Sequence, residues 1–78
     1  MTPSQSRAAR GLLKWTQDDL AREASVSVVT VRNFENEKST PQRATIEVMS
    51  RCLENAGVQF IPENGGGAGV RMREPKAP

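Results

Sequence analysis

The chain has one cysteine, no histidine and no tyrosine among its 78 residues. A structural zinc site needs several Cys or His ligands, and a Ser/His or Cys/His nucleophile needs a histidine, so the composition excludes both. No glycine-rich loop stands between a strand and a helix, so a phosphate cradle for a nucleotide is also missing. We therefore expect no enzyme activity, no catalytic residue, no metal and no cofactor.

Long apolar runs and targeting signals are absent as well. No stretch of about 18 apolar residues could cross a membrane, and the N-terminus lacks the charged-then-apolar pattern of a signal peptide. Because a single Cys52 cannot form an internal disulfide, the composition fits a reducing compartment. We expect a cytoplasmic protein without a membrane partner. A chain of this size forms one small domain that needs good helix packing, a partner chain or both.

The charge excess is small. The chain carries 11 Lys and Arg against 9 Asp and Glu, a net charge of +2. Any attraction to nucleic acid must therefore come from the sorting of charges between faces rather than from bulk charge.

The segment 16–38 carries the strongest local signals. Thr16 and Asp19 have the spacing of a capping box, and Trp15 and Leu20 have the spacing of a hydrophobic staple, so a helix is expected to begin at Thr16. Leu20, Ala21 and Ala24 then form one apolar stripe. Two short helices that meet at a tight turn are typical of a helix-turn-helix.

A second helix start follows at Ser27, where Val26 and Val31 repeat the staple spacing. The spacing predicts a helix over about 27–37, with Val31 and Phe34 facing inward. Its outer face is expected to carry four residues: Val28, Val29, Arg32 and Asn33. A helix placed in this way fits the major groove of DNA.

Two further helices are predicted around this pair. Thr2 and Gln5 form a capping box with Pro3 at the first helical position, and this helix runs to about Lys14 with Ala9, Leu12 and Leu13 on its apolar side. The fourth helix begins at Thr40 or just after it and ends at Gly57, which is placed as a left-handed cap. Its apolar stripe contains Ile46, Met49, Leu53 and Ala56, widened by Val48 and Cys52.

In residues 58–73 the apolar side chains no longer recur at the spacing of a helix. Val58 and Phe60 precede a glycine-rich segment, after which Val70 and Met72 alternate with arginines. This pattern predicts a β-hairpin with a long loop, and an isolated hairpin is marginal in water. The hairpin either pairs with another chain as a dimerisation element or folds back on the helices of its own chain. Residues 74–78 are expected to form a flexible tail.

The pattern Gln17-x-x-Leu20-Ala21, Val26-Ser27-x-x-x-Val31-x-x-Phe34-Glu35, followed by Lys38 and Pro41, resembles the Cro/repressor-type (XRE-like) helix-turn-helix family. The resemblance covers roughly residues 6–57. It implies a mainly α, four- to five-helix DNA-binding bundle, here followed by a C-terminal β-hairpin. Family members are usually homodimers that repress or regulate transcription.

Site residues follow from this resemblance. It implies that Val28, Val29, Arg32 and Asn33 face the bases and that phosphates are met by Gln17, Asn36, Lys38 and Arg43, and we expect the helix cap Ser27 to lie among these DNA-binding residues. Arg10 and Glu35 are expected to form an ion pair between the first and third helices. Two positions depart from the family pattern, since Ser25 and Glu37 stand where glycine is common.

The function expected from these observations is sequence-specific binding of double-stranded DNA by a transcriptional regulator, usually a repressor. Two alternatives remain. The near-balanced charge and the apolar Val28–Val29 face are compatible with a protein-interaction module on the same fold. A DNA-binding antitoxin whose C-terminal hairpin contacts a protein partner would carry the same signals.

Overall fold

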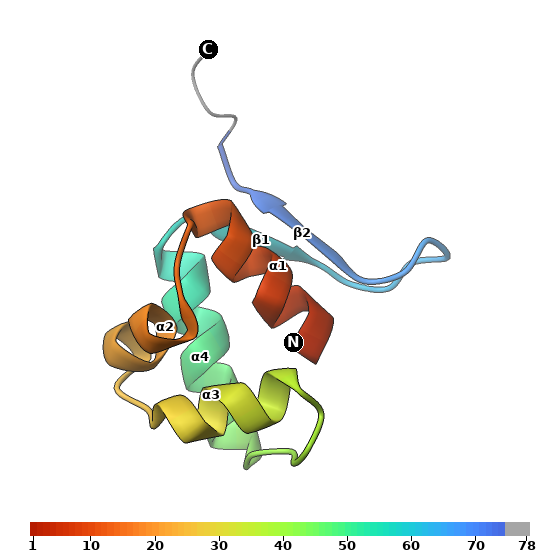
Figure 1. The fold of residues 1–78 in the computed structure, drawn as a ribbon. Helices are drawn as coiled ribbons and strands as arrows, with labels where there is room; N and C mark the ends of the chain where they lie inside the picture. The colour runs from red at the N-terminus through yellow and green to blue at the C-terminus, as the bar shows by residue number, and fades with distance from the viewer. Residues whose placement is uncertain (75–78) are drawn as a thin grey trace.

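The computed structural model describes residues 1–74, which form four helices followed by a two-stranded antiparallel hairpin (Figure 1). The helices are α1 (Pro3–Leu13), α2 (Gln17–Ala24), α3 (Val28–Glu35) and α4 (Arg43–Asn55). The strands are β1 (Val58–Ile61) and β2 (Gly69–Met72). The predicted fold class is therefore confirmed. No helix within residues 1–74 combines the length and hydrophobicity needed to span a membrane.

The capping signals of the first two helices are confirmed. Thr2 and Gln5 exchange side-chain hydrogen bonds with each other's backbone amides at 3.1 and 2.9 Å, and Thr16 and Asp19 do the same at 3.0 and 2.8 Å. Each box satisfies two amides that the start of a helix leaves without an intrahelical acceptor.

The start of α4 lies further along the chain than the pattern predicted. The helix begins at Arg43, with Gln42 as an N-cap that makes no side-chain capping hydrogen bond. Pro41 keeps Thr40 out of the helix, because a residue that precedes proline is disfavoured in the helical region, and nothing in the structure explains why the helix begins at Arg43 and not at Pro41. Thr40 therefore cannot serve as the first residue of the helix.

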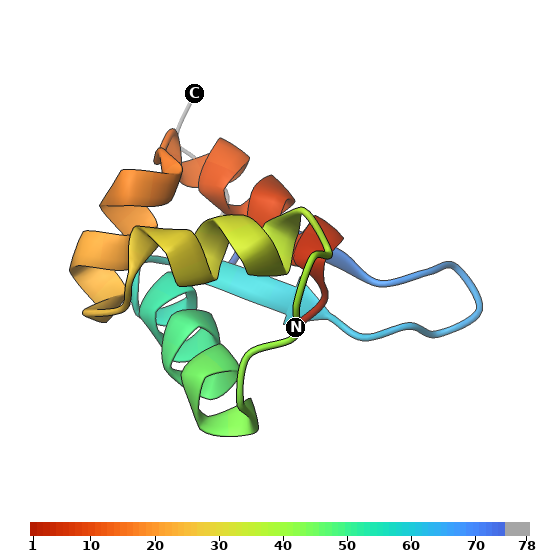
Figure 2. The same ribbon diagram turned by 60° about the horizontal axis from the view of Figure 1, so that its bottom comes forward.

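The core forms where the four helices and β1 meet. It contains nine buried hydrophobic residues: Ala9, Leu20, Ala21, Ala24, Val31, Phe34, Met49, Leu53 and Val58. The inward faces predicted for α2 and α3 are thus confirmed. Figure 2 shows α3 lying across the front of the molecule, with α1 above it and α4 below.

Two apolar residues that were assigned to core-facing stripes are exposed. Leu12 is 43% exposed and Val48 is 45% exposed. Val48 precedes the fully buried Met49 by one position, which turns its side chain about 100° around the helix. Leu12 lies in the same way beside half-buried Leu13. Both stripes were therefore predicted too wide.

The hairpin packs on the helices of its own chain. Its register pairs Val58 with Met72 and Phe60 with Val70. Val58 is 1% exposed, and the other three side chains pack against the core. Strand β2 lies beside α1, while β1 contacts α4 and α1. The hairpin thus folds back on the helices of its own chain, while its role as a dimerisation element stays a prediction.

A side chain of α1 fastens the far end of the hairpin. Gln5 is buried, and its Nε2 donates to the carbonyl oxygens of Ile61 and Gly69 at 3.2 and 3.0 Å. Beyond Ile61 the loop projects away from the helices (Figure 1). Of the tail predicted at 74–78, only Glu74 lies within the described residues.

Candidate nucleic-acid interface

The turn between α2 and α3 is built on a left-handed residue. Ser25 has φ 57° and ψ 42°, and the next amide, that of Val26, donates to the carbonyl of Ala21 at 2.9 Å. Ser27 then caps α3, its Oγ accepting from the amide of Val29 at 3.1 Å. These local bonds fix the direction of α3 relative to α2.

The outward face of α3 is narrower than the sequence predicted. Ser27, Val29 and Arg32 are exposed, and Val29 has 51% of its surface accessible. Val28 and Asn33 are half-buried, and Val28 packs against the core. The exposed face therefore offers one hydroxyl, one apolar side chain and one guanidinium.

The segment after α3 adds charge beside this face. Asn36, Lys38 and Arg43, which the resemblance assigns to phosphate contacts, are exposed. The contact between Arg43 and Glu47 is long at 3.8 Å, and both side chains are largely exposed, so Arg43 is free to reorient. Glu37 lies in the same segment, with φ 59°, and adds one negative charge.

Arg10 and Glu35, the two residues of the expected ion pair, lie against each other behind α3. Arg10 Nε is 2.9 Å from Oε2 of Glu35, and Nη2 is 2.6 Å from Oε1. The Glu35 side chain is fully buried and that of Arg10 is 17% exposed. Arg10 also donates to the carbonyl of Trp15 at 3.1 Å. This two-point contact ties α1 to the end of α3.

Two more side chains donate to the same carboxylate. Ser6 Oγ lies 2.6 Å from Oε2, and Gln17 Nε2 lies 3.1 Å from Oε1. Burial raises the pKa of Glu35, but the hydrogen bonds from Arg10, Ser6 and Gln17 outweigh it and hold the pKa below its ordinary value. The buried carboxylate is thus charged and fully partnered at neutral pH.

Gln17, the residue expected at a phosphate, is half-buried at the start of α2. Its amide nitrogen carries two hydrogens, and the bond to Glu35 uses one of them. The other hydrogen remains for a second acceptor. Glu35 therefore orients the Gln17 side-chain amide at the start of α2.

Sequence reasoning did not identify Ser6 and Arg7 as members of this network. Ser6 is fully buried, and Arg7 donates to the backbone carbonyl of Glu35. The one available signal was spacing, because Ser6 precedes Arg10 by four positions and so lies on the same side of α1. Spacing alone cannot show that a serine is buried.

Within residues 1–74 no group of three or more His, Cys, Asp or Glu side chains is placed to hold a metal ion. The chemistry at this face is that of hydrogen bonding, charge and apolar contact. Such a face can bind a surface that offers phosphates and base edges.

The comparison with protein families gives one match. A family model described as helix-turn-helix matches residues 7–55, which contain most of α1 and the whole of α2, α3 and α4. A search of curated proteins gave no significant match.

Proposed function

The chain belongs to the Cro/repressor-type helix-turn-helix family of DNA-binding regulators, and we propose that it regulates transcription, as a repressor, by binding a specific sequence in double-stranded DNA. Members of this family are DNA-binding regulators and are not typically enzymes. In this proposal α3 enters the major groove and the protein acts in the cytoplasm.

One observation carries the proposal. The outward face of α3 presents Val29 and Arg32 together, while the buried Arg10–Glu35 pair holds the opposite side of the helix. An arginine at this position can donate two hydrogen bonds to guanine, and a valine can contact the methyl group of thymine. A rigidly held helix with such a face is suited to reading base edges.

The remaining site residues have graded roles in the proposal. Ser27, Val29 and Arg32 lie closest to the DNA, while the half-buried Val28 and Asn33 contribute at the edges of the face. Gln17 at the start of α2 donates its free amide hydrogen to a phosphate. On the other side, the backbone is met by Asn36, Lys38 and Arg43.

We further propose that the regulator acts as a homodimer. Two copies related by a two-fold axis would place their α3 helices about 34 Å apart, one turn of DNA, and read a palindromic site. The hairpin was expected to supply the contact between copies. The apolar face of the hairpin packs on α1 and α4 of its own chain. The edges of its strands therefore remain available for contact with a second copy.

Selection of bound sequences from a random DNA pool tests the function. We expect a recurrent motif with two-fold symmetry. We also expect the logarithm of the binding constant to fall linearly with the logarithm of the salt concentration, with a slope of about −0.9 for each phosphate contacted. Lys38→Ala should lower this slope, whereas Arg71→Ala, which removes the same charge from the exposed face of the hairpin, should leave it unchanged. Failure to enrich any sequence would contradict the proposal.

One observation favours a second candidate, a protein-interaction module on the same fold. Val29 is the most exposed large hydrophobic side chain of the described residues, and it lies at the centre of the proposed face. An interaction module would show no salt-dependent binding to any DNA. An antitoxin would bind DNA and, in addition, a protein partner through the hairpin.

A further inference from the structure

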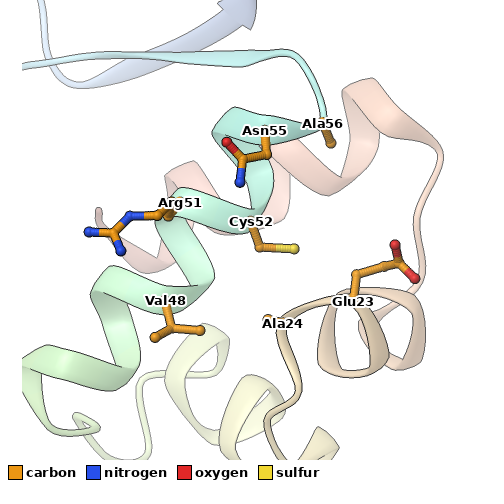
Figure 3. Close-up of a pocket in the computed structure, with 7 residues that line it drawn as sticks. All are labelled: Glu23, Ala24, Val48, Arg51, Cys52, Asn55 and Ala56. Carbon is orange, nitrogen blue, oxygen red and sulfur yellow. The ribbon is translucent and has the colours of Figure 1, made fainter.

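A groove runs along the outside of the molecule between α2 and α4 (Figure 3). Its volume is about 400 Å³. Two helices supply its main lining residues: Glu23 and Ala24 come from α2, and Val48, Arg51, Cys52 and Asn55 come from α4. We call this surface the α2–α4 groove.

The groove contains an exposed hydrophobic side chain that the proposed DNA contact does not use. Among the described residues three large hydrophobic side chains are exposed: Leu12, Val29 and Val48. Val29 belongs to the outward face of α3. Val48 lies in the groove beside Ala24 and Cys52, so its apolar surface is continuous with a floor of small side chains. Leu12 lies on α1, away from the groove.

Charged side chains of opposite sign lie on the two sides of the apolar part of the groove. Figure 3 shows Arg51 pointing away from the groove on one side and Glu23 on the other, with Cys52 between them and Val48 one helical turn before Cys52 on α4. The Glu23 side chain is 51% exposed, and its one ion pair, with Arg22, is long at 3.7 Å. Arg51 is exposed and, within residues 1–74, makes no ion pair.

This arrangement is self-complementary. In a two-fold dimer the same surface is used by both copies, so an acid on one side of the centre meets a base on the other side of the partner's centre. Each such interface contains the acid–base contact twice. The groove therefore fits a second copy of this chain better than it fits a partner of one charge.

We propose that two copies of this chain associate through the α2–α4 groove, with Glu23 of each copy facing Arg51 of the other and with Val48 and Cys52 at the centre. The inference rests on the homodimer in the proposed function and assigns the contact between copies to this groove instead of the strand edges of the hairpin. Helix α2, which lines one side of the groove, lies at the end of the molecule opposite the projecting hairpin loop (Figure 2). None of the residues that line the groove belongs to α3.

Charge reversal tests this arrangement in the full chain without DNA. Glu23→Arg and Arg51→Glu should each weaken dimerisation in sedimentation equilibrium by about tenfold or more, because each creates two like-charge contacts. The double variant should recover to within about threefold of the wild type, since the reversed charges again face each other. Arg71→Glu, on the hairpin, is the matched control and should leave dimerisation unchanged.

A second pair of variants tests the apolar centre. Val48→Asp should weaken dimerisation by about tenfold or more, while Leu12→Asp, at a position of almost equal exposure, should not. Thermal unfolding followed by circular dichroism checks that both variants are folded. The exposed positions of both side chains give no reason for either substitution to unfold the chain.

Cys52 provides a direct distance test. Burial raises the pKa of its thiol, and the Glu23 carboxylate raises it further, so cross-linking is done at mildly alkaline pH. A short bis-maleimide should join two wild-type chains through Cys52 and should fail with Arg51→Glu. A wild-type chain that is monomeric at high micromolar concentration, or a dimer that responds only to Arg71→Glu, would overturn the proposal.

Failure of this interface and failure of DNA binding give different results. If the interface is wrong, the charge-reversal variants associate like the wild type, whatever their behaviour with DNA. If the DNA-binding function is wrong, the wild type dimerises with the predicted charge pattern but binds no half-site duplex. Association and half-site binding are therefore measured separately for every variant.

Discussion

Arg10 of α1 and Glu35 of α3 are joined by two hydrogen bonds, of 2.9 Å from Nε to Oε2 and 2.6 Å from Nη2 to Oε1. The carboxylate has no exposed surface, and Ser6 and Gln17 donate to its two oxygens as well. A buried carboxylate with this many donors fixes the relative placement of α1, α2 and α3. The helix proposed to read DNA is thus held from behind by charge as well as by packing.

The first prediction concerns the loss of one partner. Arg10→Met should lower the free energy of unfolding by about 3–5 kcal/mol, because it leaves the Glu35 charge buried without its cation. Adding Glu35→Met should recover part of this loss, since no charge then remains in the interior. Urea unfolding of both single variants and the double variant gives the coupling energy.

The exposed ion pair on α2 is the control for this comparison of single and double variants. Arg22 and Asp19 lie 2.9 Å apart, with 67% and 31% of their side chains exposed. Arg22→Met should cost less than about 1 kcal/mol. A zero coupling energy between Arg10 and Glu35 would show that the buried pair acts as two independent charges.

The second prediction follows from the pKa of Glu35. Hydrogen bonds from Arg10, Ser6 and Gln17 hold this pKa below the ordinary glutamate value of 4.5, despite burial. A lowered folded-state pKa contributes stability above the unfolded-state value, and this stability is lost as pH falls through the folded-state pKa. Wild-type stability should therefore decline on acidification below about pH 4.5.

The isosteric variant Glu35→Gln separates this effect from general acid unfolding. It should be less stable than the wild type at neutral pH, and the difference should shrink as pH falls below the ordinary glutamate value. Chemical unfolding at a series of pH values measures the difference. A constant difference down to the lowest pH would contradict a lowered pKa.

Local features of this fold could be predicted from the sequence. The capping boxes at Thr2 and Thr16 were predicted correctly because they depend on residues three positions apart. The left-handed conformation of Ser25 agrees with the family pattern, in which glycine is common at this position. Interactions of short range in sequence need no knowledge of tertiary packing.

Long-range features could not be predicted from pattern alone. The burial of Gln5 depends on carbonyl groups of Ile61 and Gly69, which come close only when the hairpin folds back. The exposure of Val48 depends on which part of α4 the other helices cover. Periodicity locates the apolar side of a helix, but it does not give the width of the surface that its neighbours bury.

The third prediction concerns the left-handed turn. Ser25→Gly should raise the free energy of unfolding by about 1 kcal/mol, because glycine adopts φ 57° without the clash of a Cβ atom. Ser50→Gly is the matched control, since Ser50 lies within α4, where the same substitution should cost about 1 kcal/mol. If both variants lose stability equally, strain at Ser25 makes no contribution.

The fourth prediction concerns the hairpin as part of the core. Val58→Ala should cost about 2 kcal/mol, since the side chain is 1% exposed and packs in the main core. Gln59→Ala, at an exposed position of the same strand, should cost much less. Thermal unfolding compares the two. Equal and small effects would mean that the helices fold independently of the hairpin.

The fifth prediction concerns specificity. Arg32→Ala should cost about 1–3 kcal/mol in binding to the preferred DNA sequence and should relax the preference at one base position. The reason is that the exposed guanidinium lies on the outward face of α3 beside Val29, where it can donate to a base edge. Lys38→Ala should instead weaken binding to preferred and random sequences alike, as expected for a phosphate contact. Arg71→Ala, with the same loss of charge on the hairpin, should change neither.

Titration of each variant with both kinds of duplex, at two salt concentrations, distinguishes these effects. If Arg32→Ala loses affinity equally on preferred and random DNA, Arg32 contacts the phosphate backbone, and base recognition must come from other side chains of α3.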